Sequence, residues 1–124
     1  MRILVVDDEK DVKTLFLQRF RREIRDGLFE FSFCFSGEDA MDYITTNVQE
    51  AILILSDINM PGMTGIELLC KINAEIPQPK PIVMMITAYD DKSSRDQAIQ
   101  YGAQEVFIKP LDFQAIKDKL IQLK

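Results

Sequence analysis

Short apolar runs alternate along the chain with longer stretches in which apolar residues recur every three or four positions. Four of these runs are continuous and end close to a polar residue, and they cover residues 3–6, 51–55, 82–86 and 106–108. Continuous apolar runs of this length are typical of parallel strands that are buried on both faces. The pattern therefore predicts four strands of a buried sheet.

A fifth run has a period of two, because polar residues separate its aromatic ones. Its apolar positions are Phe29, Phe31, Phe33 and Phe35. Alternation gives a strand one apolar and one mixed face. An aromatic platform for stacking nucleic-acid bases is one interpretation of this run. The acidic chain favours the other, an edge strand that lays its aromatic face on a layer of helices.

The segments between the runs have helical spacing. Val12, Phe16, Phe20 and Ile24 recur every four residues, which predicts a helix over residues 11–25 that ends before Gly27. Further helices are predicted after the capping residues Ser36 and Thr64, over residues 90–101, and from Phe113 to Leu123.

Five strand–helix pairs in this order predict an α/β fold, a doubly wound parallel sheet with helices on both faces. The length of 124 residues is that of one domain. The proline-rich stretch 77–81 lies between a helix and a strand, and its five residues indicate a stiff connection.

Composition excludes several classes of function. The chain has 15 basic and 20 acidic residues, a formal net charge of −5 and no histidine. The acidic balance argues against direct binding of nucleic acid or of an anionic membrane. The lack of histidine excludes Ser-His-Asp and Cys-His catalysis, histidine-ligated zinc and a phosphohistidine on this chain.

Location is predicted from three further features. No apolar run approaches the roughly 20 residues of a membrane helix, and the first residues are not typical of a signal peptide. Cys34 and Cys70 are far apart in sequence and fit two buried, reduced thiols. The expected location is cytoplasmic.

The informative polar residues all follow predicted strands, where a doubly wound sheet binds its ligands. They are Asp7, Asp8, Asp57, Asn59, Thr87 and Lys109.

Two carboxylates within about 4 Å repel by about 4 kcal/mol at an effective dielectric constant of 20. Oxygen ligands without His or Cys favour Mg²⁺ as the cation that relieves this repulsion. A cation, a lysine and a hydroxyl around a free carboxylate suit a phosphoryl group. Each residue alone could equally cap a helix or be solvated.

Four motifs carry a resemblance to a known family: ILVVDDE at 3–9, SDINMPGMTGIELL at 56–69, ITA at 86–88 and FIKP at 107–110. With them the chain resembles a response-regulator receiver domain of bacterial two-component signalling. The resemblance covers all 124 residues. It implies a flavodoxin-like (βα)5 fold in three layers with strand order 2-1-3-4-5. It also implies that residues 1–124 are one receiver domain with no output domain.

The resemblance assigns roles at the site. Asp57 is the expected phosphoacceptor, and Mg²⁺ (or Mn²⁺) is the expected cofactor. Asp8 would bind the metal directly, Asp7 would act through water, and the Asn59 backbone carbonyl would supply a further ligand. Lys109 would contact the phosphoryl group, and its bond to Pro110 is expected to be cis.

The resemblance also implies a switch. Thr87 would move toward the phosphoryl oxygens and Phe107 would turn inward, while the small Ala88 leaves access to the acyl phosphate. The bulky Tyr89, two residues after Thr87, is expected to shield the acyl phosphate from water. The segments 90–101, 106–108 and 113–123 would form the surface that changes.

The implied partners are a histidine kinase or phosphotransfer protein as donor, and an effector domain or target protein as recipient of the signal. Dimerisation on phosphorylation is one form that the output takes in this family. The domain would be a signalling phosphoacceptor that assists its own phosphorylation and dephosphorylation, and not an enzyme acting on other substrates.

Two other functions stay open. A small Mg²⁺-dependent phosphohydrolase with an aspartyl nucleophile, of the haloacid-dehalogenase type, would carry Asp-x-Asp on its first strand, whereas this chain has Asp7-Asp8-Glu9 and no cap domain. A degenerate receiver would serve only as an interaction module, and the full set of site residues argues against it.

Two features are less standard for the family, namely the bulky Tyr89 and a basic stretch of the first predicted helix. Arg19, Arg21, Arg22 and Arg25 make the end of the first predicted helix basic. This is either a solvated face or a docking surface for a kinase or a neighbouring domain.

Overall fold

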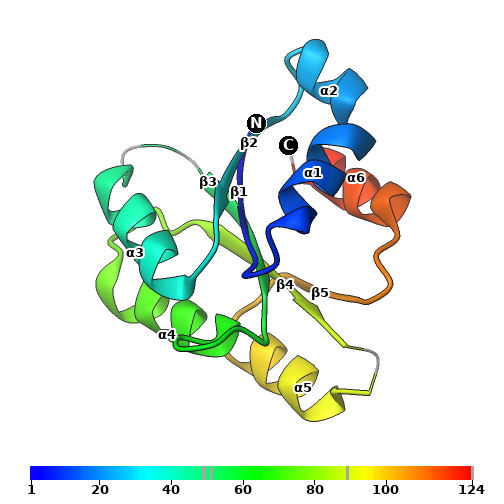
Figure 1. Ribbon diagram of the computed structural model, residues 1–124. Helices are drawn as coiled ribbons and strands as arrows, with labels where there is room; N and C mark the ends of the chain where they lie inside the picture. The colour runs from blue at the N-terminus through cyan, green and yellow to red at the C-terminus, as the bar shows by residue number, and fades with distance from the viewer. Residues whose placement is uncertain (49, 51, 89, 124) are drawn as a thin grey trace.

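A computed structural model describes residues 1–48, 50, 52–88 and 90–123. Strands and helices alternate, apart from one interruption in the first helical segment (Figure 1). In chain order the elements are β1 (Arg2–Val6), α1 (Asp11–Arg19), α2 (Arg21–Arg25), β2 (Glu30–Cys34), α3 (Gly37–Thr46), β3 (Ile52–Asp57), α4 (Gly65–Glu75), β4 (Ile82–Thr87), α5 (Lys92–Gln100), β5 (Glu105–Ile108) and α6 (Phe113–Gln122).

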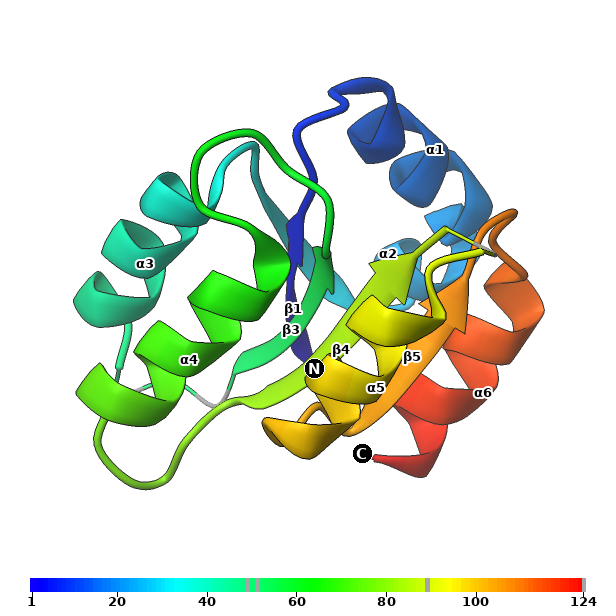
Figure 2. The same ribbon diagram turned by 90° about the horizontal axis from the view of Figure 1, so that it is seen from below.

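The five strands form one parallel sheet in the order β2-β1-β3-β4-β5. Helices α1, α2 and α6 lie on one face of the sheet, and α3, α4 and α5 lie on the other (Figure 2). This confirms the predicted three-layer, doubly wound fold and its strand order. Because all the strands are parallel, their carboxyl ends lie along one edge of the sheet.

Residues of each strand alternate between two cores, as the pleat of a strand requires. Leu4 and Val6 pack with aliphatic residues of α3 and α4, whereas Ile3 and Val5 pack on the side of α1 and α6. The second core is rich in aromatic residues. These are Phe16, Phe20, Phe29, Phe31 and Phe113, with the rings of Phe16 and Phe113 centred 5.2 Å apart. The aromatic face of β2 therefore packs on a helix layer at the sheet edge, as predicted.

The capping predictions are confirmed. The Ser36 hydroxyl accepts a hydrogen bond from the Asp39 N–H at 3.0 Å. Thr64 and Glu67 form a complete capping box at the start of α4. Gly27 ends the first helical segment with a φ of +76°, which favours glycine. Among the described helices, none combines the length and the apolar character that crossing a membrane requires.

Three expectations need correction, two about secondary-structure elements and one about the cysteines. The helix predicted over residues 11–25 is interrupted at Phe20, whose φ of −107° and ψ of 20° separate α1 from α2 while its ring is buried against β2. The run 106–108 is half-buried, with Ile108 36% exposed, because β5 is the last strand of the sheet.

Only one of the two cysteines matches the prediction. Cys34 is buried, and burial raises the pKa of its thiol to about 11, so this thiol stays protonated. Cys70 is exposed, because it lies on the outer face of α4.

Candidate functional site

The three predicted acidic residues meet at the carboxyl-terminal edge of the sheet. Asp7 and Asp8 follow β1, and Asp57 is the last residue of the neighbouring strand β3. Each offers a carboxylate oxygen, and these oxygens lie within 4.8 Å of one another. Asp7 and Asp57 are each only 3% exposed, whereas Asp8 is exposed to solvent. The cluster thus has two buried members and one at the surface.

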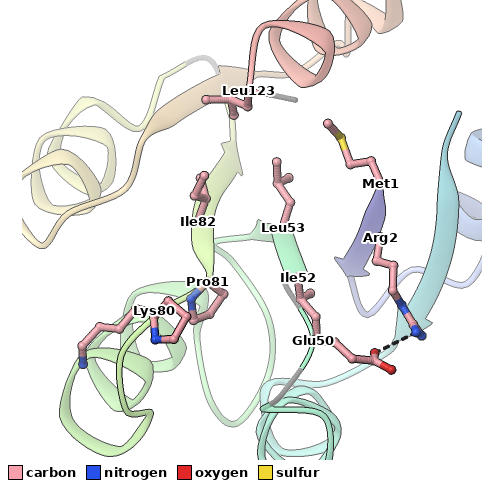
Figure 3. Close-up of a pocket in the computed structure, with 10 residues that line it drawn as sticks. Met1, Arg2, Glu50, Ile52, Leu53, Lys80, Pro81, Ile82 and Leu123 are labelled. Atoms are coloured by element: carbon pink, nitrogen blue, oxygen red, sulfur yellow. Dashed lines mark ion pairs between the residues drawn. The ribbon is translucent and has the colours of Figure 1, made fainter.

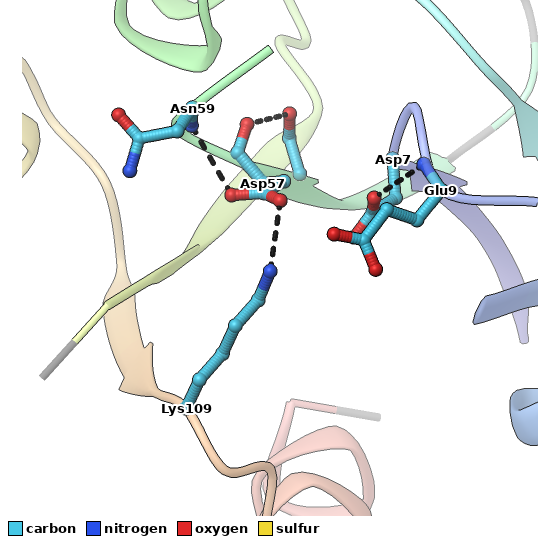
Figure 4. Close-up of polar contacts among 6 residues, drawn as sticks. Asp7, Glu9, Asp57, Asn59 and Lys109 are labelled. Atoms are coloured by element: carbon cyan, nitrogen blue, oxygen red, sulfur yellow. Dashed lines mark hydrogen bonds and ion pairs between the residues drawn. The ribbon is translucent and has the colours of Figure 1, made fainter. Parts of the chain in front are cut away.

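Both carboxylate oxygens of Asp57 are held in place. The Asn59 N–H donates to Oδ1 at 3.1 Å, and the Lys109 Nζ donates to Oδ2 at 3.0 Å (Figure 4). Lys109 follows β5, and its own N–H donates to the Thr87 carbonyl at 2.9 Å. The lysine therefore reaches Asp57 across the intervening end of β4.

The neighbouring carboxylates stabilise the positive charge of Lys109. Partial burial alone would lower the pKa of its ammonium, but the hydrogen bond and charge of Asp57, with the charges of Asp7 and Glu9, outweigh this and raise the pKa. Lys109 is consequently a permanent positive charge beside Asp57 at neutral pH.

The negative charge of Asp7 is unfavourable in this cluster. Burial raises the pKa of its carboxyl from an ordinary 3.8 to about 6, the Asp57 charge adds to this, and a hydrogen bond from the Glu9 N–H at 2.9 Å opposes it. A carboxylate that is hard to ionise next to a second one marks a place where positive charge would be bound.

Thr87 ends β4 beside Asp57 and is completely buried. Within the described part of the chain, its hydroxyl has no hydrogen-bond partner. Buried hydroxyls are normally satisfied, so this one is suited to a group that is not part of the chain. Ala88, next along, is half-buried. Tyr89, for which a shielding role is predicted, lies outside the described residues.

The remaining predicted residues flank this centre. Phe107 is half-buried and packs against the aromatic core on the side of α1 and α6, next to Ile86 in the strand register. The Asn59 side chain is exposed and points away from Asp57 (Figure 4). The Lys109–Pro110 bond is cis, as expected.

Two residues that position Asp57 were not singled out from the sequence. Gly65 lies so close beneath it that an added Cβ would stand 2.3 Å from the Asp57 carbonyl oxygen and 2.8 Å from the Ile58 Cα. Ser56 is fully buried and its hydroxyl donates to the Asp57 carbonyl at 2.9 Å. A glycine directly after a helix cap was the available signal for Gly65, since an ordinary helix favours other residues there.

The donor set fits a hard divalent cation. It consists of carboxylate oxygens alone, in a chain without histidine, and Mg²⁺ prefers such ligands. The difficulty of ionising Asp7 in the protein alone is the second observation that agrees with a cation here. The carboxylates of Asp7, Asp8 and Asp57 are the groups that could hold it.

An apolar cavity of about 370 Å³ lies at the opposite, amino-terminal edge of the sheet (Figure 3). Leu53, Ile82 and Leu123 form part of its wall, and an ion pair of 2.8 Å joins Arg2 and Glu50 at its rim. Its lining contains no group of facing carboxylates. Among the described residues, the facing carboxylates that could bind a cation therefore lie at the carboxyl-terminal edge.

Comparisons with known proteins identify the family of the chain. Residues 3–121 match the family model of the response regulator receiver domain. A chemotaxis protein CheY homolog of Campylobacter jejuni is 32% identical over 120 residues, which are 97% of this chain and 89% of that protein. The sporulation initiation phosphotransferase F of Bacillus subtilis is 32% identical over 94% of this chain and 88% of its own length.

Solved structures share the fold. A response regulator receiver protein from Pseudomonas putida superposes with a TM-score of 0.84 at 16% identity, over 98% of this chain and 95% of that one. A chain described as adenylate cyclase from Rhodopirellula baltica superposes with a TM-score of 0.81 at 27% identity, over 98% of this chain and 84% of that one.

Proposed function

Because the chain belongs to the response regulator receiver domain family, we propose that Asp57 accepts a phosphoryl group from the phosphohistidine of a histidine kinase or phosphotransfer protein. One observation carries the proposal. The Asp57 carboxylate is buried at a strand end, 3.0 Å from the Lys109 ammonium and within 4.8 Å of the Asp7 and Asp8 carboxylates. Residues 1–124 act as one receiver domain in this proposal.

Asp57, Lys109 and Thr87 have separate roles in the transfer of the phosphoryl group. A carboxylate oxygen of Asp57 attacks phosphorus, the bond from phosphorus to the donor's imidazole nitrogen breaks, and the imidazole keeps the electron pair and takes a proton. Lys109 offsets charge on the phosphoryl oxygens. The Thr87 hydroxyl donates to one of them, which gives this buried group the partner it lacks among the described residues.

A bound Mg²⁺ (or Mn²⁺), held by Asp7, Asp8, Asp57 and the Asn59 carbonyl, would neutralise negative charge both on these carboxylates and on the phosphoryl group. Asp57 supplies the nucleophile and the other three residues supply ligands. Attack of water on the acyl phosphate returns Asp57 to its carboxylate form, and Ala88 and Tyr89 control how water reaches it.

The output follows from Thr87 and Phe107. When Thr87 turns toward the phosphoryl oxygens it vacates space at the end of β4, and Phe107 on the adjacent strand moves inward. The exposed side of α5, β5 and α6 changes with it and is recognised by an effector domain, a target protein or a second copy of the chain. The domain is thus a signalling phosphoacceptor of the cytoplasm, and not an enzyme with a separate substrate.

The test is phosphorylation by acetyl phosphate in the presence of Mg²⁺, followed by the intact mass. The expected adduct is a single phosphoryl group, about 80 Da, that is lost in Asp57→Asn. The matched control Asp42→Asn, which removes an exposed carboxylate on α3, should keep the adduct. Continuous turnover of varied phosphate esters would instead indicate a phosphohydrolase. An unmodified protein without turnover would indicate an interaction module.

A further inference from the structure

Four arginines gather where α1 ends and α2 begins. Arg19, Arg21, Arg22 and Arg25, named the arginine patch below, are all exposed. The chain as a whole carries a net charge of −5, so this is a local reversal of its charge. The patch is not part of the acidic site.

The acid that lies among these arginines already has a partner on another helix. Glu23 lies within α2, but its carboxylate pairs with Lys117 of α6 at 2.8 Å and its side chain is only 11% exposed. Among the described residues, Arg21 and Arg22 have no ion-pair partner, and Arg25 pairs only with the adjacent, exposed Asp26. Most of the positive charge of the patch is therefore exposed without an ion pair among the described residues.

The surface around the patch combines hollows with exposed apolar and aromatic side chains. Hollows of about 400 Å³ and about 280 Å³ flank it, and Arg19 and Glu23 line both. The Arg19 guanidinium lies over the Phe113 ring, 5.4 Å from its centre, which limits its motion. Leu17, one turn before Arg21, is 38% exposed. Arginine beside apolar and aromatic groups is enriched in protein–protein interfaces.

The patch lies at the end of the molecule that is opposite to Asp57. Leu28, just after α2, accepts a hydrogen bond from the Met1 nitrogen, so α2 is close to the start of β1 (Figure 1). Asp57 is at the carboxyl end of the adjacent strand. A partner bound to the patch leaves the phosphorylation site open.

We propose that the arginine patch is a docking surface for an acidic segment of a partner protein. The charge favours an acidic partner, since arginine forms bidentate bonds with carboxylates. A protein is favoured over a nucleic acid because the acidic remainder of the chain repels a long phosphate backbone. The surface is also independent of the proposed function, so either can fail without the other.

The test uses the full chain and a fluorescein-labelled peptide rich in glutamate with interspersed leucines, titrated at near-physiological salt and followed by anisotropy. Arg21→Gln/Arg22→Gln removes two arginines of the patch that have no ion-pair partner among the described residues. It should weaken binding at least about tenfold. The matched variant Lys71→Gln/Lys92→Gln removes the same charge from α4 and α5 and should change binding less than about twofold.

Acetyl phosphate labelling of Asp57 should be the same in Arg21→Gln/Arg22→Gln as in the parent, which separates docking from phosphorylation. Failure of the parent chain to bind the peptide, or equal weakening by both double variants, would overturn the proposal. Tighter binding to duplex DNA or to vesicles of anionic lipid than to the peptide would also overturn it, in favour of those surfaces.

Discussion

The two edges of the sheet treat their polar groups in opposite ways. At the amino-terminal edge, Arg2 pairs with Glu50 at 2.8 Å and donates to the Tyr43 hydroxyl at 3.4 Å. Tyr43 in turn shares a hydrogen bond of 2.9 Å with the Ser32 hydroxyl. Each of these groups has a partner within the chain, so together they hold β1, β2 and α3 against one another.

At the carboxyl-terminal edge, Asp57 has partners, but other buried groups lack full compensation. Asp7 is hard to ionise, the Thr87 hydroxyl lacks a partner among the described residues, and backbone contacts at Gly65 leave no room for a side chain. Each feature lowers stability or restricts substitution. The carboxyl-terminal edge is therefore suited to bind a group that is not part of the chain, whereas the amino-terminal edge contributes to stability.

The largest difference should be seen at two glycines. Gly65→Ala at the carboxyl-terminal edge places a Cβ 2.3 Å from a backbone oxygen that cannot move without displacing Asp57. We expect a loss of about 3 kcal/mol in the free energy of unfolding and a lower yield of phosphorylated protein. Urea denaturation and intact mass measure the two effects.

Gly27→Ala at the amino-terminal edge is the matched control. Gly27 has no atom within 4 Å of an added Cβ, so only its φ of +76° opposes the substitution. That conformation costs about 1 kcal/mol. Phosphorylation should be unaffected. Equal losses of stability and of phosphorylation in both variants would contradict the comparison.

The second difference concerns how the stability of the fold changes with pH. The pKa of Asp7 is about 6 in the folded protein against an ordinary 3.8, so the folded state binds the extra proton between these values. Stability of the metal-free protein should therefore fall as pH rises from about 4 to about 6, and stay lower above. Asp7→Asn removes the ionisation and should stabilise the metal-free protein by about 2 kcal/mol at pH 7.5, but hardly at pH 4.

Bound Mg²⁺ should act in the opposite direction and favour the parent chain. Mg²⁺ at pH 7.5 should raise the thermal midpoint of the parent chain more than that of Asp7→Asn, because only the parent has the full set of carboxylates. Both melts are run with and without EDTA. A parent chain that is more stable than Asp7→Asn in EDTA at pH 7.5 would show that the Asp7 charge is already compensated within the protein.

The third difference is between two hydroxyls. Thr87→Val replaces a buried hydroxyl that has no partner among the described residues with a methyl group of similar size, and should stabilise the unphosphorylated chain by about 1 kcal/mol. Tyr43→Phe removes a hydroxyl that bonds to Ser32 and Arg2, and should destabilise it by about 1 kcal/mol. Opposite signs in urea denaturation are the expected result, and a loss in both would mean that Thr87 is satisfied in solution.

The sequence predicts those structural features that depend on neighbouring residues in the chain, and it fails for features that depend on tertiary packing. The apolar runs and the polar residues after them place Asp57 and Lys109 at one edge, because parallel strands align their carboxyl ends whatever the details of packing. The interruption at Phe20 and the exposure of Ile108 depend on packing against β2 and on being last in the sheet. No local pattern contains that information.

The same limit applies within the site. A threonine after a strand is visible in the sequence, but the lack of a partner for Thr87 depends on every neighbour that could have supplied one. The constraint on Gly65 likewise arises from the backbone of β3, which comes close only once the sheet and α4 have packed. The sequence thus indicates which groups are present, and the fold decides which of them remain unsatisfied.

The smallest effect is expected for the ion pair of the amino-terminal edge. The side chains of Arg2 and Glu50 are 36% and 37% exposed, so water screens their attraction. Glu50→Gln should reduce the free energy of unfolding by about 0.5 kcal/mol. The reduction should nearly vanish at about 1 M salt, where the screening length is about 3 Å. Urea denaturation at low and high salt measures it.

A loss above about 2 kcal/mol that persists in salt would be expected only of a desolvated pair. The amino-terminal edge would then hold buried charge as the Asp57 edge does, and the contrast between the two edges would rest on Thr87 and Gly65 alone.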